Sequence, residues 1–306
     1  MSVLVCITGR NNDKLMAKLK GALPDVDIYL WPHCDNLADI EFVLVWKAPE
    51  ELWQQLPNLK VVQSFGAGVD GIPVDKLPPD VEVARIVDKQ LSHDMAEYVL
   101  SHILAYKLRS QEYSANQSTS YWKPRRARQG ATAGILGMGE LGAVVAKRLS
   151  ANGLSVRGWS RTAKQLDNIR CFHGEEQLSE FLSQLDYLVC LLPLTDATAG
   201  ILNRALFNQV SSDCLLINVA RGQHLNEHDL LEALDCGELG HAVLDVFVTE
   251  PLPKDHAFWS NPKVTVTPHV AAVTNLDTVV AQITSNIKAC LEKKPIKNTV
   301  DITVGY

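Results

Sequence analysis

The chain has 306 residues, of which 46% are hydrophobic and 21% are charged. Its length suggests two domains, and its composition is that of an ordinary globular protein, which excludes a disordered chain, a collagen-like fibre and a coiled coil. The net charge of -6 offers no general attraction to DNA or acidic lipid, so neither nucleic acid nor a membrane surface is an expected partner.

Targeting signals and cysteines give further exclusions. The longest apolar stretch, residues 187–194, is far shorter than the ~20 residues that a membrane-spanning helix requires. Residues 3–8 are typical of a first strand and lack the basic leader of a signal peptide, so we expect a cytoplasmic protein. The seven cysteines contain no C-x-x-C pair, which argues against a disulfide framework or a zinc ribbon and favours small, buried apolar positions for most of them.

Short β-branched runs alternate with helical stretches in the first part of the chain. We expect strands at residues 3–8, 26–30, 41–46 and 61–64, and a helix over residues 13–23. This alternation predicts a parallel sheet with helices on both faces. Ser92 is a candidate N-cap for a longer apolar helix over residues 94–107, which is long enough to cross between domains.

The alternation restarts at Ala133, after a polar segment that Pro124 interrupts. We expect strands at 133–136, 155–159, 187–192, 214–219, 241–247 and 264–267, and a late helix over 281–292 that returns to the first sheet. The predicted fold class is α/β, with two doubly wound parallel-sheet domains. A flavodoxin-like substrate domain would comprise residues 1–94 and 284–306, and an inserted Rossmann domain residues 95–283.

The clearest cofactor motif is a G-x-G-x-x-G sequence between a strand and a helix. Its residues are Gly137, Met138, Gly139, Glu140, Leu141 and Gly142. Small residues let the backbone approach a pyrophosphate, and the start of the helix offers unpaired N–H groups and the positive end of its dipole. A tight turn without a ligand is the alternative, but the strand before the motif and the helical spacing after it favour dinucleotide binding.

The second strand of such a domain usually ends in an acid that binds the ribose hydroxyls of NAD. Here residues 155–159 are followed by Ser160, Arg161 and Thr162, with Lys164 close behind. Two cations beside two hydroxyls favour the additional phosphate of NADP, so we expect NADPH to be preferred over NADH. A solvated basic turn is the alternative.

Three later strands are each followed by a reactive side chain: Arg221, Glu250 and His269. Open α/β sheets bind ligands at the carboxyl ends of their strands. His269 is suited to give a proton to a carbonyl oxygen during hydride transfer, and a neighbouring Glu250 would stabilise the imidazolium form. Arg221 would hold a substrate carboxylate or polarise the carbonyl. Asp245 is either an acceptor for the nicotinamide amide or a buried structural acid.

Together these motifs resemble the D-isomer-specific 2-hydroxyacid dehydrogenases, and within them the bacterial glyoxylate/hydroxypyruvate reductases of type A. The resemblance runs from residues 44–46 through 65–70 to Gly305 and Tyr306. It is carried by the segments 137–142, 218–222, 245–253 and 267–272. Many members of the family have an acid where this chain has Ser160, which puts NAD use in doubt rather than the reaction.

The resemblance implies roles for particular residues. The catalytic set would be Arg221, Glu250 and His269. Cofactor contacts would come from 138–141, 160–162, Leu192, Pro193, Val219, Ala220 and Asp245. Backbone N–H groups of Ala67 and Gly68 would bind the substrate carboxylate, and Trp46 corresponds to a pocket position, although an aromatic residue at a strand end is also typical of a core. A homodimer is implied, with Trp122 near the partner's active site.

The prediction is therefore an NADP-dependent dehydrogenase that reduces small 2-oxo acids, glyoxylate and hydroxypyruvate foremost. A reductase of bulkier 2-oxo acids is the first alternative, and a dinucleotide-sensing regulatory protein without turnover is the second. The basic run of Lys123, Arg125, Arg126 and Arg128 is expected to be a solvated loop. His224 and His228 lie around a candidate N-cap, Asn226, without a third ligand, so no metal is predicted.

Overall fold

The computed structural model describes residues 2–78 and 80–301, so Gly305 and Tyr306 lie outside the described residues. The chain forms two compact units: one comprises the chain up to Leu91 and again from Thr274, and the other comprises Ser92–Val273. The first boundary falls inside helix α2 (Lys89–Lys107), and the second falls just before helix α8 (Leu276–Leu291). The boundaries placed from the sequence, after residues 94 and 283, lie further along the chain.

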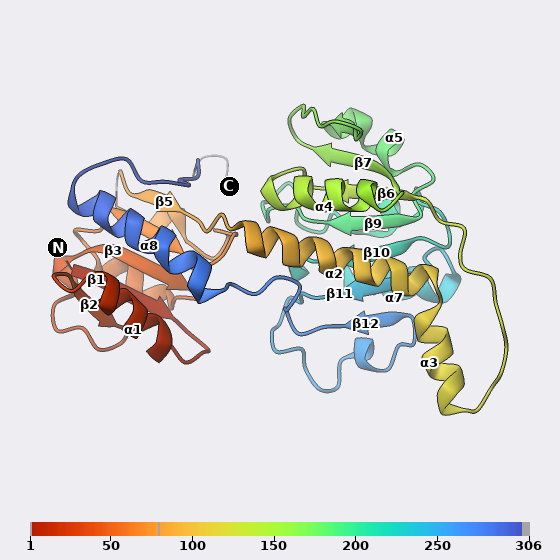
Figure 1. Cartoon of the computed structure of the whole chain (residues 1–306), viewed down its shortest axis with the longest axis horizontal. Helices are drawn as coiled ribbons and strands as arrows, with labels where there is room; N and C mark the ends of the chain where they lie inside the picture. The colour runs from red at the N-terminus through yellow and green to blue at the C-terminus, as the bar shows by residue number, and fades with distance from the viewer. Residues whose placement is uncertain (1, 79, 302–306) are drawn as a thin grey trace. The chain divides into compact units, whose positions relative to one another are not determined.

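The first unit is built on a five-stranded sheet with the order β2-β1-β3-β4-β5, in which every pair is parallel (Figure 1). This is the flavodoxin-like order, so the predicted fold of this unit is confirmed. Helix α8 and helix α1 (Asp13–Ala22) cover one face, and a 3-10 helix (Glu50–Gln55) packs on the other. The strands are β1 (Ser2–Ile7), β2 (Asp27–Leu30), β3 (Ile40–Trp46), β4 (Val61–Ser64) and β5 (Glu82–Ala84).

The second unit contains a seven-stranded parallel sheet with the order β12-β11-β10-β9-β6-β7-β8. Read from β8, this is the Rossmann order 3-2-1-4-5-6 with one more strand at the edge, which confirms the predicted fold. Its topological switch point lies between β6 and β9, where such sheets bind their ligands. The strands are β6 (Thr132–Leu136), β7 (Ser155–Ser160), β8 (Arg170–His173), β9 (Tyr187–Cys190), β10 (Leu215–Asn218), β11 (His241–Leu244) and β12 (Val264–Val266).

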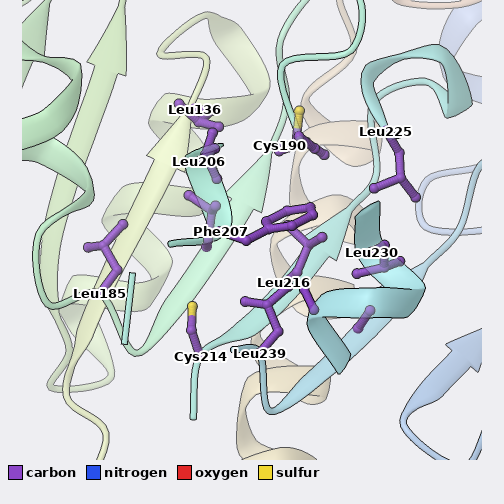
Figure 2. Close-up of a cluster of buried hydrophobic side chains, with 14 of the residues drawn as sticks. Leu136, Leu185, Cys190, Leu206, Phe207, Cys214, Leu216, Leu225, Leu230 and Leu239 are labelled. Carbon is purple, nitrogen blue, oxygen red and sulfur yellow. The ribbon is translucent and has the colours of Figure 1, made fainter. Parts of the chain in front are cut away.

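Helices cover both faces of this second sheet. Helices α2 and α4 (Glu140–Ala151) bury their apolar sides on one face. The other face is covered by α5 (Leu178–Leu182), α6 (Arg204–Phe207) and α7 (Glu227–Cys236). Figure 2 shows part of this second core, where Phe207 of α6 lies among Leu216 of β10, Leu230 of α7 and Cys190 of β9.

All seven cysteines are free. Cys6, Cys190 and Cys214 are buried, but three others are half-buried and Cys236 is exposed, so the prediction that most of the cysteines are buried was wrong. Burial raises the pKa of the Cys190 thiol to about 12, so it packs as a neutral apolar group. In the part of the chain that the structure describes, no helix combines the length and the apolar character needed to cross a membrane.

Several elements differ from the sequence-based expectations. Helix α2 begins at Lys89, because the Asp88 carboxylate accepts the N–H of Gln90 (3.0 Å), so the proposed N-cap at Ser92 was wrong. Strands β5 and β8 and helix α3 (Ser110–Ser118) were not predicted. Most of the basic run is an exposed loop, as expected. Arg128 is the exception, since its guanidinium lies 4.2 Å from the Tyr106 ring centroid and pairs with Asp213.

Candidate active site

The three candidate catalytic residues follow three neighbouring strands of the second sheet. Arg221 comes after β10, Glu250 after β11 and His269 after β12, and these strands pair in parallel in that order. The carboxyl ends of parallel strands meet at one edge of the sheet, so all three side chains arise from that edge. Each of them is partly exposed.

His269 and Glu250 are in direct contact. The Nδ1 atom of His269 lies 3.1 Å and 3.0 Å from the two carboxylate oxygens of Glu250. Glu250 Oε1 also accepts the backbone N–H of Phe247 (3.2 Å), which fixes the carboxylate on its own loop. Because the carboxylate engages Nδ1, Nε2 is the imidazole nitrogen that can donate a proton to a substrate oxygen.

Arg221 begins a turn that packs against the segment leading to Glu250. A Cβ atom on Gly222 would overlap the backbone of Phe247 and Val248, so only glycine permits this approach. The Nη1 of Arg221 donates to the Ala220 carbonyl (2.6 Å), which restrains the guanidinium. The buried His224 ring accepts the Arg221 N–H at Nδ1 (3.2 Å), while its Nε2 donates to the Pro193 carbonyl (3.2 Å).

Asp245 follows β11 and is 1% exposed. Its Oδ1 accepts from the Thr267 hydroxyl (2.6 Å) and the Val270 N–H (2.8 Å), and its Oδ2 accepts the Ala271 N–H (2.9 Å). Asp245 is therefore a buried structural acid, which is one of the two roles that the sequence left open. A carboxylate has about four acceptor positions, so Oδ2 retains capacity for a further donor such as an amide.

The glycine-rich turn joins β6 to α4 at the topological switch point. Gly137 has φ +102°, and a Cβ atom there would lie 2.6 Å from the Leu191 carbonyl oxygen, so the turn requires glycine. A Cβ on Gly142 would overlap the Gly137 carbonyl oxygen, whereas a Cβ on Gly139 would meet no atom within 4 Å. Gly139 thus presents open backbone at the start of α4, which is what a bound pyrophosphate needs.

The remaining candidate cofactor residues surround this turn in different ways. Met138 is buried against Gly158 of β7, so its side chain belongs to the core, while Gly139 and Glu140 are exposed. Leu192, Val219 and Ala220 are buried, and Pro193 and Leu141 are half-buried. After β7, Ser160 Oγ donates to the Thr162 carbonyl (2.8 Å), and this bond shapes a turn on which the side chains of Arg161, Thr162 and Lys164 are exposed.

The candidate substrate residues Trp46, Ala67 and Gly68 lie in the first unit. The Trp46 ring packs directly on Gly66, where a Cβ atom would overlap it, so this aromatic residue is partly in the core. Ala67 and Gly68 are partly exposed. Ser64 shapes their turn, because its hydroxyl accepts the Gly66 N–H (3.2 Å) and donates to the Gly68 carbonyl (2.7 Å).

The chain is similar in sequence to known dehydrogenases. The family model described as the NAD binding domain of the D-isomer-specific 2-hydroxyacid dehydrogenases matches residues 100–271. A glyoxylate/hydroxypyruvate reductase A from Serratia proteamaculans is 43% identical over 305 residues, which cover 97% of each chain. The chain belongs to the D-isomer-specific 2-hydroxyacid dehydrogenase family.

Solved structures of the family agree in fold over the whole chain. A dehydrogenase from Xanthobacter autotrophicus Py2, in complex with NADPH and MES, has a TM-score of 0.92 and 35% identity, covering 100% of this chain and 99% of that one. An NADPH-dependent glyoxylate/hydroxypyruvate reductase from Sinorhizobium meliloti, in complex with NADP and sulfate, has the same TM-score and identity and covers both chains completely.

Sequence reasoning missed several residues that shape the turns on which the candidate residues lie. His224 was considered only as a metal ligand, yet it holds the Arg221 turn. Ser64 and Thr267, whose hydroxyls bond the Gly68 carbonyl and the Asp245 carboxylate, were also missed, since a serine or a threonine carries no motif that reveals its partner. Within residues 2–78 and 80–301, no group of His, Cys, Asp and Glu residues is arranged to hold a metal ion.

Proposed function

We propose that the protein reduces small 2-oxo acids with NADPH, converting glyoxylate to glycolate and hydroxypyruvate to D-glycerate. The observation that carries the proposal is the contact between His269 and Glu250, at the edge of the sheet that bears the glycine-rich turn. The relatives named glyoxylate/hydroxypyruvate reductase A, and the related structures in complex with NADPH or NADP, support the substrate class and the cofactor.

The proposed roles follow from carbonyl reduction. Bound NADPH supplies the hydride. Arg221 binds the substrate carboxylate or polarises its carbonyl with a planar fork of N–H donors. His269 gives the proton to the carbonyl oxygen from Nε2, and Glu250 stabilises the imidazolium that must be present before the transfer. Backbone N–H groups of Ala67 and Gly68, in the turn that Ser64 shapes, bind the carboxylate.

The proposed cofactor site uses two parts of the second unit. The open backbone at Gly139 and the first turn of α4 would hold the pyrophosphate, and residual acceptor capacity on Asp245 Oδ2 would receive the nicotinamide amide. Ser160 stands where an acid would select NAD, so Arg161 and Lys164 would bind the additional phosphate of NADPH. We further propose that the protein is a homodimer, as the family resemblance implies. It would work in the cytoplasm, where the reducing environment keeps thiols such as its seven free cysteines unpaired.

The test is oxidation of NADPH and of NADH in the presence of glyoxylate, hydroxypyruvate, pyruvate, phenylpyruvate or 2-oxoisovalerate, followed by the near-ultraviolet absorbance of the reduced cofactor. We expect the fastest oxidation with NADPH and the two small polar acids. Faster oxidation with phenylpyruvate or 2-oxoisovalerate would favour a reductase of bulkier acids. No oxidation, with NADPH still bound, would favour the regulatory protein.

A further inference from the structure

His269 has an unusual backbone conformation. Its φ angle is +55°, in the left-handed region that side-chain-bearing residues adopt infrequently. Its N–H donates to two carbonyls, that of Asp245 (2.9 Å) and that of Thr267 (3.1 Å). A backbone held in a sparsely populated region persists only when its surroundings fix it, so the groups around His269 determine where the imidazole lies.

Asp245 is the centre of that support. Besides the carbonyl that binds the His269 N–H, its carboxylate accepts the next two backbone N–H groups, those of Val270 and Ala271. Three consecutive amides of the loop therefore bind one buried residue. The same carboxylate accepts the hydroxyl of Thr267, two residues before His269, so both sides of the histidine are attached to it.

The support extends to helix α2. Tyr98 Oη lies 2.6 Å from Thr267 Oγ1, which itself lies 2.6 Å from Asp245 Oδ1. A carboxylate can only accept here, so the Thr267 hydroxyl donates to Asp245 and the Tyr98 hydroxyl donates to Thr267. Burial, with a contribution from the Asp245 charge, raises the pKa of Tyr98 despite its bond to Thr267, so the phenol remains a donor over the working pH range.

We propose that Tyr98 and Thr267 are positioning residues, which act through Asp245 to hold His269 in its left-handed conformation and its Nε2 at the substrate carbonyl. This inference rests on the proposed function for the meaning of that position. Proton transfer depends steeply on geometry, and displacement of a catalytic group by about 1 Å costs on the order of a hundredfold in rate. A hydrogen-bond chain that begins at Tyr98 of α2 thereby reaches the backbone of the proton donor and sets its efficiency.

The principal variant is Tyr98→Phe, which removes only the hydroxyl and keeps the ring against His102, whose centroid is 4.4 Å away. The matched control is Tyr106→Phe on the same helix. The Tyr106 hydroxyl donates to the Asp213 carbonyl (2.9 Å) and is not part of the hydrogen-bond chain through Thr267 and Asp245. Thr267→Val breaks the hydrogen-bond chain between Tyr98 and Asp245 at its centre. Thr267→Ser keeps the hydroxyl and should preserve both hydrogen bonds.

Enzyme kinetics and amide hydrogen exchange together distinguish a positioning role from an effect on general stability. We expect Tyr98→Phe to lower kcat for glyoxylate by about 5-fold and Thr267→Val by more than about 10-fold, with a larger solvent deuterium isotope effect and little change in the dissociation constant of NADPH. Tyr106→Phe and Thr267→Ser should stay within about 2-fold of the unmodified protein. Amide hydrogen exchange at Val270 and Ala271 should accelerate in the first two variants alone.

The outcomes are distinguishable. If the unmodified protein oxidises NADPH with none of the 2-oxo acids, the proposed function fails, and the exchange rates alone decide whether Tyr98 fixes the loop. If it is active but Tyr98→Phe and Thr267→Val keep its kcat and isotope effect, the positioning role is overturned even when exchange accelerates. An equal loss in Tyr106→Phe would also overturn it, because the effect would then be one of helix stability.

Discussion

Two histidine–carboxylate pairs of the second unit have short contacts, and they differ in place rather than in chemistry. His269 Nδ1 lies 3.0 Å from Glu250, and His256 Nε2 lies 3.1 Å from Glu227. The first pair stands directly after two adjacent strands. The second joins α7 to the segment before β12, where the His256 ring also caps a short helix by accepting the Phe258 N–H. At the scale of single residues, position on the sheet edge therefore distinguishes the proposed catalytic pair from the other.

Replacement of His269 by alanine removes the proposed proton donor. We expect turnover with glyoxylate to fall by ~100-fold or more, while NADPH still binds, because a positioned general acid contributes at least that factor. His256→Asn is the matched control, since asparagine can keep the helix cap, and it should retain near-normal turnover. Steady-state kinetics and NADPH titration measure both; a normal rate in folded His269→Ala would exclude the role of His269.

Cofactor choice is a second property of individual side chains. Replacing Arg161 and Lys164 together by alanine should weaken NADPH binding by about tenfold or more and leave NADH binding nearly unchanged, because in the proposed site these cations bind the additional phosphate, which NADH lacks. Lys147→Ala with Arg148→Ala, on the exposed side of α4, removes the same charge as a control. Dissociation constants for both cofactors decide the matter, and equal weakening of NADPH and NADH would contradict the phosphate assignment.

At the scale of elements, the two glycines Gly139 and Gly142, at the start of α4, have different surroundings. Gly142 is where α4 touches the Gly137 carbonyl, so a side chain there would push the helix off the sheet. Gly139 has φ -81° and open space around it, so a methyl group fits the protein without strain. The same substitution at these two glycines therefore has different physical consequences.

We expect Gly139→Ala to keep the stability of the protein but to weaken NADPH binding by about tenfold or more, because the methyl group would occupy the approach of the pyrophosphate. Gly142→Ala should instead destabilise folding by about 2 kcal/mol or more through overpacking. Urea denaturation and NADPH titration of both variants provide the comparison. Normal NADPH affinity in Gly139→Ala would argue against a pyrophosphate at this turn.

The sequence predicted those elements whose apolar pattern is strong. Buried strands such as β9 and β10 were found within two residues of their ends, and α4 followed from its helical spacing. The elements that were missed have weak patterns: β5 is three residues long, β8 has Phe172 as its one buried residue, and α3 buries none of its side chains. Their existence depends on neighbours that only the folded chain supplies.

Some residues of the candidate site could likewise be predicted from the sequence, and others could not. Arg221, Glu250 and His269 could be proposed because each follows a predicted strand, and the structure brings His269 and Glu250 into contact. The bond between Tyr98 and Thr267 could not be proposed, because 169 residues separate them in the chain. Local patterns reveal strand ends, whereas contacts between a helix and a distant loop require the three-dimensional fold.

At the scale of the whole molecule, a buried histidine links stability to pH. His241, at the start of β11, is 5% exposed, and its Nε2 lies 2.9 Å from the Thr265 hydroxyl, which Gln111 also contacts (2.5 Å). Burial above all, followed by the charges of Arg128 and His102, lowers the pKa of His241 from 6.5 to about 4. The folded protein therefore keeps this imidazole neutral at a pH where the unfolded chain binds a proton.

Acid should consequently destabilise the fold. As the pH falls from 6.5 towards 4, the unfolded state takes up the proton first, so the free energy of unfolding decreases, by about 2 kcal/mol at about pH 5 from this one group. His241→Gln, which can still bond Thr265, should show a correspondingly weaker loss between about pH 7.5 and 5 in urea titrations. His228→Gln, at an exposed position, serves as the control, and an unchanged pH dependence in His241→Gln would rule out this source.

The return of the chain to its first sheet has a consequence for biosynthesis. Val279, Ile283 and Ile287 of α8 complete the core that α1 begins on one face of the first sheet. A ribosome that adds about 5–20 residues per second releases the strands of that sheet roughly ten seconds or more before α8. The second unit is synthesised during that interval, while an apolar face of the first sheet waits for α8. Nascent chains should therefore recruit chaperones to their amino-terminal part until translation is almost complete.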